Sequence, residues 1–150
     1  MKHKSYMKEA LALAEEALSK GEVPVGAIIV LNKKIIGRGF NQCITTNDPT
    51  AHAEVVALRE AAEACGNYRL SQAKIYTTLE PCLMCMGALI HSRIKEVFFS
   101  TRDPKSGVLV SNDNFFKKMS FLNHSFEYKE GCLRESSSNL LKDFFLTKRV

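Results

Sequence analysis

The chain has 150 residues, of which 45% are hydrophobic and 25% charged, and its formal net charge is +5. This length suits one domain over residues 1–150 with a sizeable core, and the composition excludes a low-complexity or disordered protein. The modest basic excess suits a nucleic-acid partner, although an ordinary lysine-rich surface explains it equally well.

Membrane-spanning and secreted classes also fit poorly. The longest apolar stretch, residues 23–31, has the length of a strand and is too short to cross a bilayer. Lys2 and Lys4 precede acidic residues rather than an apolar run, so we do not expect a signal peptide. Five cysteines are an odd number, and nothing else indicates secretion. We therefore expect free thiols and a cytoplasmic location.

The first half of the chain predicts a helix, a hairpin and a second helix. The expected elements are a helix over about 4–19, strands over 23–31 and 34–40, a polar loop over 41–49 and a helix over about 51–65. Only Asn32 and Lys33 separate the two strands, which predicts a tight hairpin. Gly21 and Gly66 follow the two helical patterns and are expected to end them.

The second half alternates strands and helices. The expected elements are strands over 73–78, 95–100 and 126–129, helices over about 81–91 and from beyond Gly131 to about 148, and a loop over 101–114. Such alternation predicts parallel strand pairs with helices on the faces of the sheet. With the N-terminal hairpin added, the fold class is α/β, in three α/β/α layers around a mixed sheet of about five strands.

Two predicted helices begin with residues that suit a metal site. His52 and Glu54 lie in the first turn of one helix, where side chains tilt toward the N-terminus and can converge ahead of it. Cys82 and Cys85 follow Pro81 three residues apart and share one face of the next helix. One neutral imidazole and two thiolates suit Zn²⁺, and three protein ligands leave its fourth position open. Glu54, close by but a poor fourth ligand, is then placed to move protons.

Other interpretations of the same residues remain open. The Cys-x-x-Cys pair could be redox-active, merely buried, or half of a closed structural zinc site, and Glu54 could only cap its helix. A closed site needs a fourth ligand, and none of the other cysteines or histidines has a paired spacing. Each motif is weak alone, but His-x-Glu followed by Pro-Cys-x-x-Cys is the signature of zinc-dependent nucleobase deaminases.

The sequence resembles the bacterial tRNA-specific adenosine deaminases, within the cytidine deaminase-like superfamily, over nearly its whole length. The matching stretches are Glu22 to Ala27, Asn41, Asp48 to Glu54, Thr78 to Cys85, Ile90 to Arg93, Asp103 to Gly107, Asn123-His124 and Asp143 to Phe145. The resemblance implies hydrolytic deamination of adenosine to inosine at the wobble position of a tRNA anticodon. It also implies one zinc per chain held by His52, Cys82 and Cys85, with Glu54 moving protons between a zinc-activated water and the base.

The resemblance further implies a set of substrate-binding residues. Asn41 would hydrogen-bond the target nucleotide, Val25 and Leu79 would wall the base pocket, and Asp103 would contact the sugar-phosphate. The remaining implied contacts with the anticodon come from the last part of the chain, namely Asn123, His124, Phe145 and Arg149. From the residues alone, Asn41 and Asp103 are also ordinary turn residues, and Val25 and Leu79 ordinary core residues.

Family members are homodimers whose active sites are completed across the interface, so the resemblance implies a homodimer and a tRNA partner. Two alternatives remain at this point. The same chemistry could act on a free base or nucleoside, such as guanine or cytosine, although Asn123, His124 and the basic C-terminal tail would then have no use. A zinc-stabilised RNA-binding module without catalysis would leave Glu54 and the open metal position unexplained.

Overall fold

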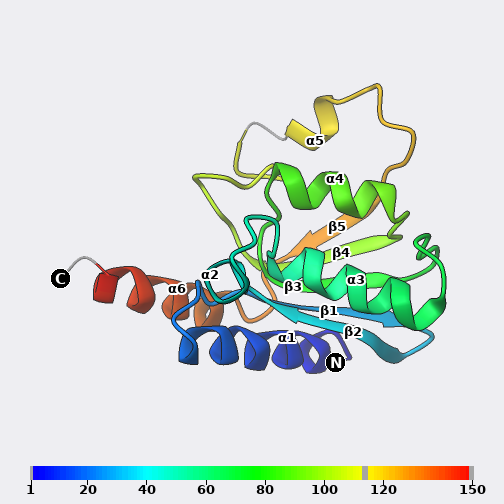
Figure 1. Cartoon of the computed structure of the whole chain (residues 1–150). Coiled ribbons are helices and arrows are strands. Elements are labelled where there is room, and N and C mark those ends of the chain that lie inside the picture. The colour runs from blue at the N-terminus through cyan, green and yellow to red at the C-terminus, as the bar shows by residue number, and fades with distance from the viewer. Residues whose placement is uncertain (1, 113–114, 149–150) are drawn as a thin grey trace.

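The computed structural model describes residues 2–112 and 115–148 (Figure 1). The helices are α1 (Lys2–Ser19), α2 (Cys43–Thr46), α3 (Ala53–Cys65), α4 (Leu83–His91), α5 (Phe115–Lys118) and α6 (Arg134–Lys148). The strands are β1 (Gly26–Leu31), β2 (Lys34–Phe40), β3 (Lys74–Leu79), β4 (Glu96–Thr101) and β5 (Glu127–Glu130). No helix in these two described ranges is long and apolar enough to span a membrane.

The strands form one five-stranded mixed sheet in the order β2-β1-β3-β4-β5. Strand β1 is antiparallel to both β2 and β3, whereas β3, β4 and β5 run parallel. At the β1–β2 connection Asn32 and Lys33 have φ angles of 51° and 66°, the left-handed pair that a two-residue type I′ turn requires. The predicted hairpin, parallel pairs and α/β class are therefore confirmed.

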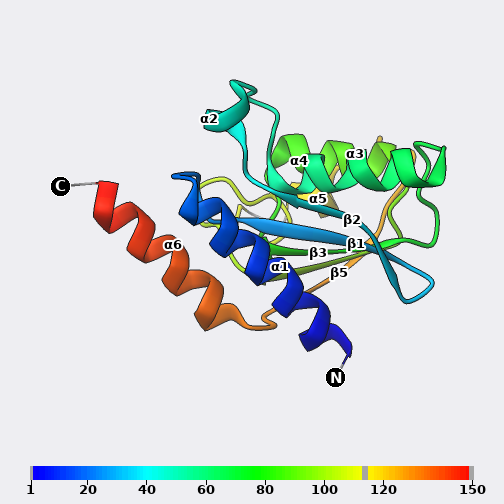
Figure 2. The same ribbon diagram turned by 60° about the horizontal axis from the view of Figure 1, so that its bottom comes forward.

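Helices cover both faces of the sheet, as Figures 1 and 2 show: α1 and α6 lie on one face, and α3 and α4 on the other. The side chains of strand β1 point alternately to these two faces. Ala27 and Ile29 pack in the core under α3 and α4, while Ile28 and Val30 pack under α1 with Tyr76. Burial of both faces explains why residues 23–31 read as one apolar run rather than as an alternating pattern.

Helix α3 lies directly against β2 because glycine leaves room for it. A Cβ atom on Gly39 would overlap the backbone carbonyl oxygen of Ala53, the first residue of the helix. This contact places the beginning of α3 next to the end of β2, beside Asn41. The sequence of the second strand thus fixes where the first turn of α3 lies.

The structure adds two short helices to the predicted elements and moves the beginnings of others. The polar loop over 41–49 contains the short helix α2, and α5 follows the loop over 101–114. Each has four residues, too few to display a helical period. Strand β1 begins at Gly26 rather than Val23, and α3 begins at Ala53 rather than Ala51. His52 therefore lies immediately before its helix instead of inside it.

Candidate active site

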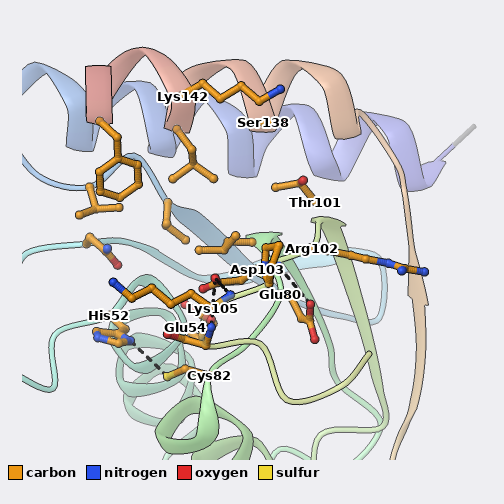
Figure 3. A pocket seen from close by; sticks show the side chains of 18 of the residues that line it. His52, Glu54, Glu80, Cys82, Thr101, Arg102, Asp103, Lys105, Ser138 and Lys142 are labelled. Atoms are coloured by element: carbon orange, nitrogen blue, oxygen red, sulfur yellow. Dashed lines mark hydrogen bonds between the residues drawn. The ribbon is translucent and has the colours of Figure 1, made fainter. Parts of the chain in front are cut away.

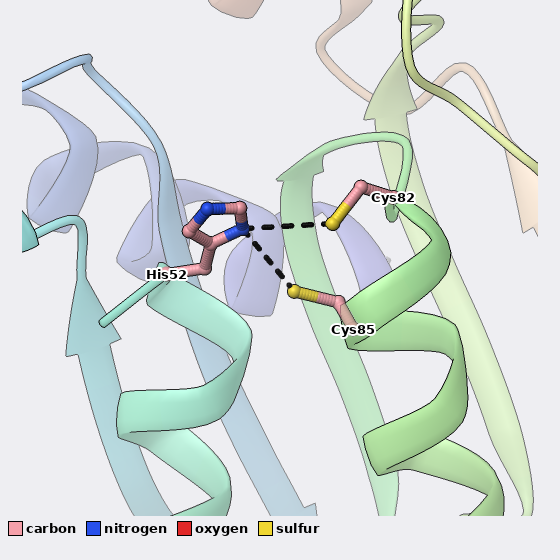
Figure 4. Close-up of side chains that lie close together, drawn as sticks. All are labelled: His52, Cys82 and Cys85. Atoms are coloured by element: carbon pink, nitrogen blue, oxygen red, sulfur yellow. Dashed lines mark hydrogen bonds between the residues drawn. The ribbon is translucent and has the colours of Figure 1, made fainter. Parts of the chain in front are cut away.

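Two helix starts meet at one end of the sheet. His52 is the residue before α3, with φ of −73° and ψ of 153°, and Cys82 is the residue before α4, with φ of −82° and ψ of 177°. Neither side chain caps its own helix by a hydrogen bond, so both are free to point ahead of it. Cys85 lies one turn inside α4 and is fully buried. Figure 4 shows the two sulfur atoms facing the same ring nitrogen of His52.

The distances between these atoms fit a shared metal ion. His52 Nδ1 lies 3.6 Å from Cys82 Sγ and 3.5 Å from Cys85 Sγ, and the three atoms all lie within 4.8 Å of one another. Zinc binds thiolate sulfur at about 2.3 Å and imidazole nitrogen at about 2.0–2.1 Å. At tetrahedral angles those bonds place nitrogen and sulfur about 3.5 Å apart. The spacing and the donor set therefore fit zinc, with His52 offering Nδ1.

The protonation of the two thiols suits the same role. A hydrogen bond from Cys85, reinforced by one from His52, lowers the pKa of Cys82 to about 4, although burial opposes the shift. The same hydrogen bond, together with burial, raises the pKa of Cys85. The hydrogen bond with Cys82 also raises the pKa of His52. The lowered pKa of Cys82 favours its thiolate form, and a cation bound by both sulfur atoms would displace the proton held by Cys85.

Glu54 lies beside this group in the first turn of α3. Its residue surface is 4% exposed, and burial raises the pKa of its carboxyl group to about 7, with the nearby Cys82 thiolate adding to the shift. A carboxyl group that titrates near neutral pH can both accept and donate a proton. The predicted convergence of His52 and Glu54 ahead of one helix is confirmed, because both line the same cavity.

A cavity of about 800 Å³ opens over these residues. It lies at the carboxyl ends of the parallel strands β3 and β4, where open α/β sheets place their ligands. Figure 3 shows Ser138 and Lys142 on the α6 side of this cavity and His52, Glu54 and Cys82 on the opposite side. The wall also contains five of the residues that the sequence predicted to bind substrate: Val25, Asn41, Leu79, Asp103 and Phe145.

The side chain of Asn41 is hydrogen-bonded to the beginning of α3, next to His52. Its Oδ1 accepts a hydrogen bond of 2.9 Å from the backbone N–H of Ala53. Asp103 is held within its own loop, since its Oδ1 accepts the N–H groups of Lys105 and Ser106 at 3.1 and 3.2 Å. Asp103 thus combines a turn role with a place in the cavity wall, whereas Asn41 lines the cavity and binds the beginning of α3.

The two neighbouring aromatic residues of the last helix lie in different surroundings. Phe144 is 8% exposed and packs inward, whereas Phe145 is 48% exposed and lines the cavity. Their rings meet edge to face with centroids 5.3 Å apart. Phe145 therefore presents an aromatic face to whatever occupies the cavity.

Two of the other predicted RNA contacts, Asn123 and His124, do not line this cavity. Asn123 Oδ1 accepts a hydrogen bond of 3.1 Å from Arg93, and His124 Nε2 lies 2.8 Å from the carbonyl oxygen of Ile94. Both residues are on the α5–β5 side of the sheet, away from the lining of the cavity. Arg149 lies outside the described residues.

Sequence reasoning missed one buried acidic residue of the site. Glu80, for which the sequence suggested no separate role, is 1% exposed and lies in the cavity wall. Burial alone would raise its pKa, but hydrogen bonds from the Ser111 hydroxyl and from backbone N–H groups lower it. The carboxylate oxygens of Glu80 accept hydrogen bonds from a loop more than twenty residues further along the chain. No local sequence pattern could therefore reveal the contact.

Comparison with known proteins gives a consistent result. Residues 1–149 match the family model described as MafB19-like deaminase. The tRNA-specific adenosine deaminase of Haemophilus influenzae is 46% identical over 144 residues, which covers 95% of this chain and 83% of that protein.

Two solved structures resemble the fold. One comes from work on A-to-I editing by tRNA:A34 deaminases at the wobble position, with a TM-score of 0.88 and 38% identity over 91% of this chain and 99% of that one. Guanine deaminase from Bacillus subtilis gives a TM-score of 0.67 and 34% identity over 100% of this chain and 96% of that one. With this sequence identity, and with His52, Cys82 and Cys85 gathered beside a cavity that Glu54 also lines, the chain belongs to the family of tRNA-specific adenosine deaminases.

Proposed function

We propose that this protein converts adenosine to inosine at the wobble position of tRNA anticodons by hydrolysis. The observation that carries the proposal is the meeting of the His52, Cys82 and Cys85 ligand group with a buried Glu54 in a cavity. The identity to tRNA-specific adenosine deaminases supports tRNA as the polymer around the target base. The basic net charge suits such a partner.

His52, Cys82 and Cys85 would hold one zinc ion per chain, which when bound supplies a Lewis acid that makes a water nucleophilic near neutral pH. Glu54 would take a proton from the attacking water as its oxygen bonds to C6 of adenine. Glu54 would pass this proton to N1. It would then move the second proton from the oxygen now bonded to C6 to the exocyclic amine, so that the C6–N bond breaks, ammonia leaves and C6 becomes a carbonyl. Its raised pKa suits both halves of this transfer.

The cavity suits a base that has left its stack. Its volume of about 800 Å³ accommodates a nucleotide with part of its neighbours, and its walls combine apolar groups with the amide of Asn41. We propose that Val25 and Leu79 flank the base, that Asp103 contacts the sugar-phosphate and that Phe145 stacks near it. An anticodon loop nucleotide is already unpaired, so extruding it costs little.

We also propose a homodimer in the cytoplasm. Met86, Leu89 and Ile90 of α4 are buried within the chain, but Leu83 and Met84 on the same helix are 55% and 36% exposed. An apolar surface at the start of the ligand-bearing helix suits a second copy packed beside the active site. Asn123, His124 and Arg149 would then meet the anticodon in the assembled dimer, since Asn123 and His124 do not line the cavity of their own chain.

A second candidate function is deamination of a free base, since guanine deaminase from Bacillus subtilis shares the fold and 34% identity. Incubation with total tRNA, with inosine located by sequencing, separates the two. Adenine, adenosine, guanine and cytosine serve as control substrates, and Glu54→Gln as the inactive control. Inosine at the wobble position supports the proposal, whereas ammonia release from a free base with no inosine in tRNA contradicts it.

A further inference from the structure

The carboxylate of Glu80 lies at the centre of a loop that forms one wall of the cavity. Its Oε1 accepts hydrogen bonds from the N–H of Asp103 at 3.1 Å and from the Ser111 hydroxyl. Its Oε2 accepts the N–H groups of Leu109, Val110 and Ser111 at 3.0, 2.8 and 3.0 Å. Both oxygens are therefore fully engaged with the protein and are not available to a ligand.

The backbone around Glu80 holds the same loop. The N–H of Glu80 donates to the carbonyl oxygen of Thr101 at 2.9 Å, and the N–H of Val108 donates to the carbonyl oxygen of Pro81 at 3.1 Å. Cys82 follows directly in the chain. These two hydrogen bonds join residues 80–81, which lead into the metal-ligand helix α4, to the loop over 101–111. They lie on either side of the Glu80 side chain.

Gly107 allows the carboxylate to reach this position. A Cβ atom on Gly107 would overlap the Glu80 carboxylate group, and Gly107 has no positive φ angle that would require glycine for another reason. The loop is therefore shaped around the acidic group. Its other residues, Asp103 to Ser106, form part of the cavity wall.

We propose that Glu80 is a positioning residue, which fixes the substrate-binding loop over 101–111 relative to the metal-ligand helix without touching the RNA. The proposal rests on the function proposed above, because the loop has a substrate to hold only in that reaction. It assigns Glu80 to the binding of the tRNA rather than to proton transfer, so its loss affects KM for tRNA more than kcat.

Glu22 provides a matched control elsewhere in the chain. It is also 1% exposed, and its carboxylate accepts the N–H groups of Ile44 and Thr45 and the Thr45 hydroxyl. The residues that it holds, in α2, do not line the cavity. Glu22→Gln therefore loses a similar buried set of hydrogen bonds without displacing the loop over 101–111.

The test compares steady-state inosine formation in an anticodon stem-loop by wild type, Glu80→Gln and Glu22→Gln, with zinc content measured for each. In Glu80→Gln an amide NH₂ group replaces one acceptor oxygen and faces the N–H and O–H donors of the loop. We expect KM to rise about tenfold, kcat to stay within about threefold of the wild-type value and the zinc content to be unchanged. Glu22→Gln should leave KM near the wild-type value. The proposal is overturned if KM rises equally in both variants. It is also overturned if Glu80→Gln loses kcat together with its zinc.

Two further variants, of which Ser111→Ala is the milder, keep the test decisive if Glu80→Gln does not fold. Ser111→Ala removes only the hydroxyl donor and should raise KM by a smaller factor, while Gly107→Ala displaces the carboxylate and should raise it as Glu80→Gln does. Unchanged KM in both variants rejects the proposal.

A double-mutant cycle with Asp103 gives a signature that general destabilisation does not. If Glu80 acts through Asp103, then Asp103→Asn should raise KM less in the Glu80→Gln background than in wild type. If the effects of the two substitutions on log KM are strictly additive, Glu80 does not act through Asp103. Absence of inosine with the wild-type enzyme would instead overturn the proposed function itself, so the two failures are distinguishable.

Discussion

The side-chain oxygen of Asn41 accepts the backbone N–H of Ala53, which is the residue between His52 and Glu54. The N–H groups at the beginning of a helix have no partner within it, so this bond satisfies Ala53 and joins the end of β2 to the start of α3. Because Oδ1 is occupied, the NH₂ group of Asn41 is the part that remains to meet a ligand. Asn41 therefore aligns the ligand-bearing helix and presents a donor to the cavity.

The two roles of Asn41 can be separated by substitution. Asn41→Asp keeps an acceptor for Ala53 but removes the donor, so we expect near-normal Tm with KM for tRNA raised about tenfold or more. Asn41→Ala removes both and should also lower the free energy of unfolding by about 1 kcal/mol. Thermal unfolding and steady-state kinetics measure the two effects. Equal loss of stability in both variants would show that the acceptor is not what holds α3.

Replacing Glu54 should remove the reaction without removing the metal. Glu54→Gln preserves size but cannot shuttle protons, so inosine formation should fall about 10²–10⁴-fold while about one zinc per chain remains. Metal analysis and an inosine assay on the same preparation check this. Glu60→Gln, exposed on the same helix, is the matched control. Normal turnover by Glu54→Gln would remove Glu54 from the mechanism.

Removal of a thiol ligand should affect both metal and folding. Cys85→Ala takes away a fully buried ligand, and because metal binding is coupled to folding we expect lost zinc and a lower Tm. Treating wild type with a chelator should lower its Tm toward that of the variant. The exposed Cys65→Ala serves as the control for loss of a thiol elsewhere. Full zinc occupancy in Cys85→Ala would mean that the ligand group is wrongly assigned.

The order of helices and strands was predictable because each depends on patterns within a short stretch of chain. The same holds for the candidate metal group: His52 and Cys82 stand immediately before α3 and α4, near the starts that periodicity and Pro81 indicate in the sequence, and Cys85 follows Cys82 by three residues. Glu54 was predictable for the same reason, since its distance from His52 along the chain fixes its place in the first turn of α3.

Contacts between distant segments could not be predicted in this way. The carboxylate of Glu80 meets residues 103–111, and that of Glu22 meets α2, yet neither glutamate stands in a local pattern that announces a buried acceptor. The four-residue helices α2 and α5 are likewise stabilised by their surroundings rather than by a sequence period. For Asn123 the family resemblance suggested an RNA contact, but its hydrogen bond to Arg93 depends on the packing of the chain.

Two lysines of the cavity rim are expected to contribute to RNA affinity. Lys105 and Lys142 line the cavity, and neither forms an ion pair with another residue in the described ranges, whereas the neighbouring Arg102 is bound bidentately by Glu130. Changing both lysines to alanine should weaken tRNA binding and reduce the slope of log K against log salt by about 1.4, or about 0.7 per phosphate. Binding by the inactive Glu54→Gln protein at several salt concentrations measures the slope.

Lys34 and Lys95 provide the matched control for this pair. They are exposed and lie at the opposite end of the sheet, where β2 and β4 begin. Their double alanine variant removes the same net charge but should leave the salt slope near that of wild type. If both pairs reduce the slope equally, the attraction comes from overall charge rather than from the rim of the cavity.

Stability in acid should depend on Glu22. Burial alone would raise the pKa of its carboxyl group, but the Thr45 hydroxyl and the N–H groups of Thr45 and Ile44 outweigh it and lower the pKa from its ordinary value of 4.5. The folded state therefore binds this proton less readily than the unfolded state. The resulting stabilisation is complete above about pH 4.5 and disappears as the pH falls through the lower, folded-state pKa.

Glu22→Gln should accordingly be less stable than wild type by about 1–3 kcal/mol at pH 7, and this difference should shrink as the pH falls below about 4.5. Urea unfolding at pH 7 and at stepwise lower pH values measures it. Glu15→Gln, exposed on α1, should show no such pH-dependent difference. A difference between Glu22→Gln and wild type that stays constant from pH 7 to pH 3 would mean that the hydrogen bonds of Glu22 do not favour its charged form.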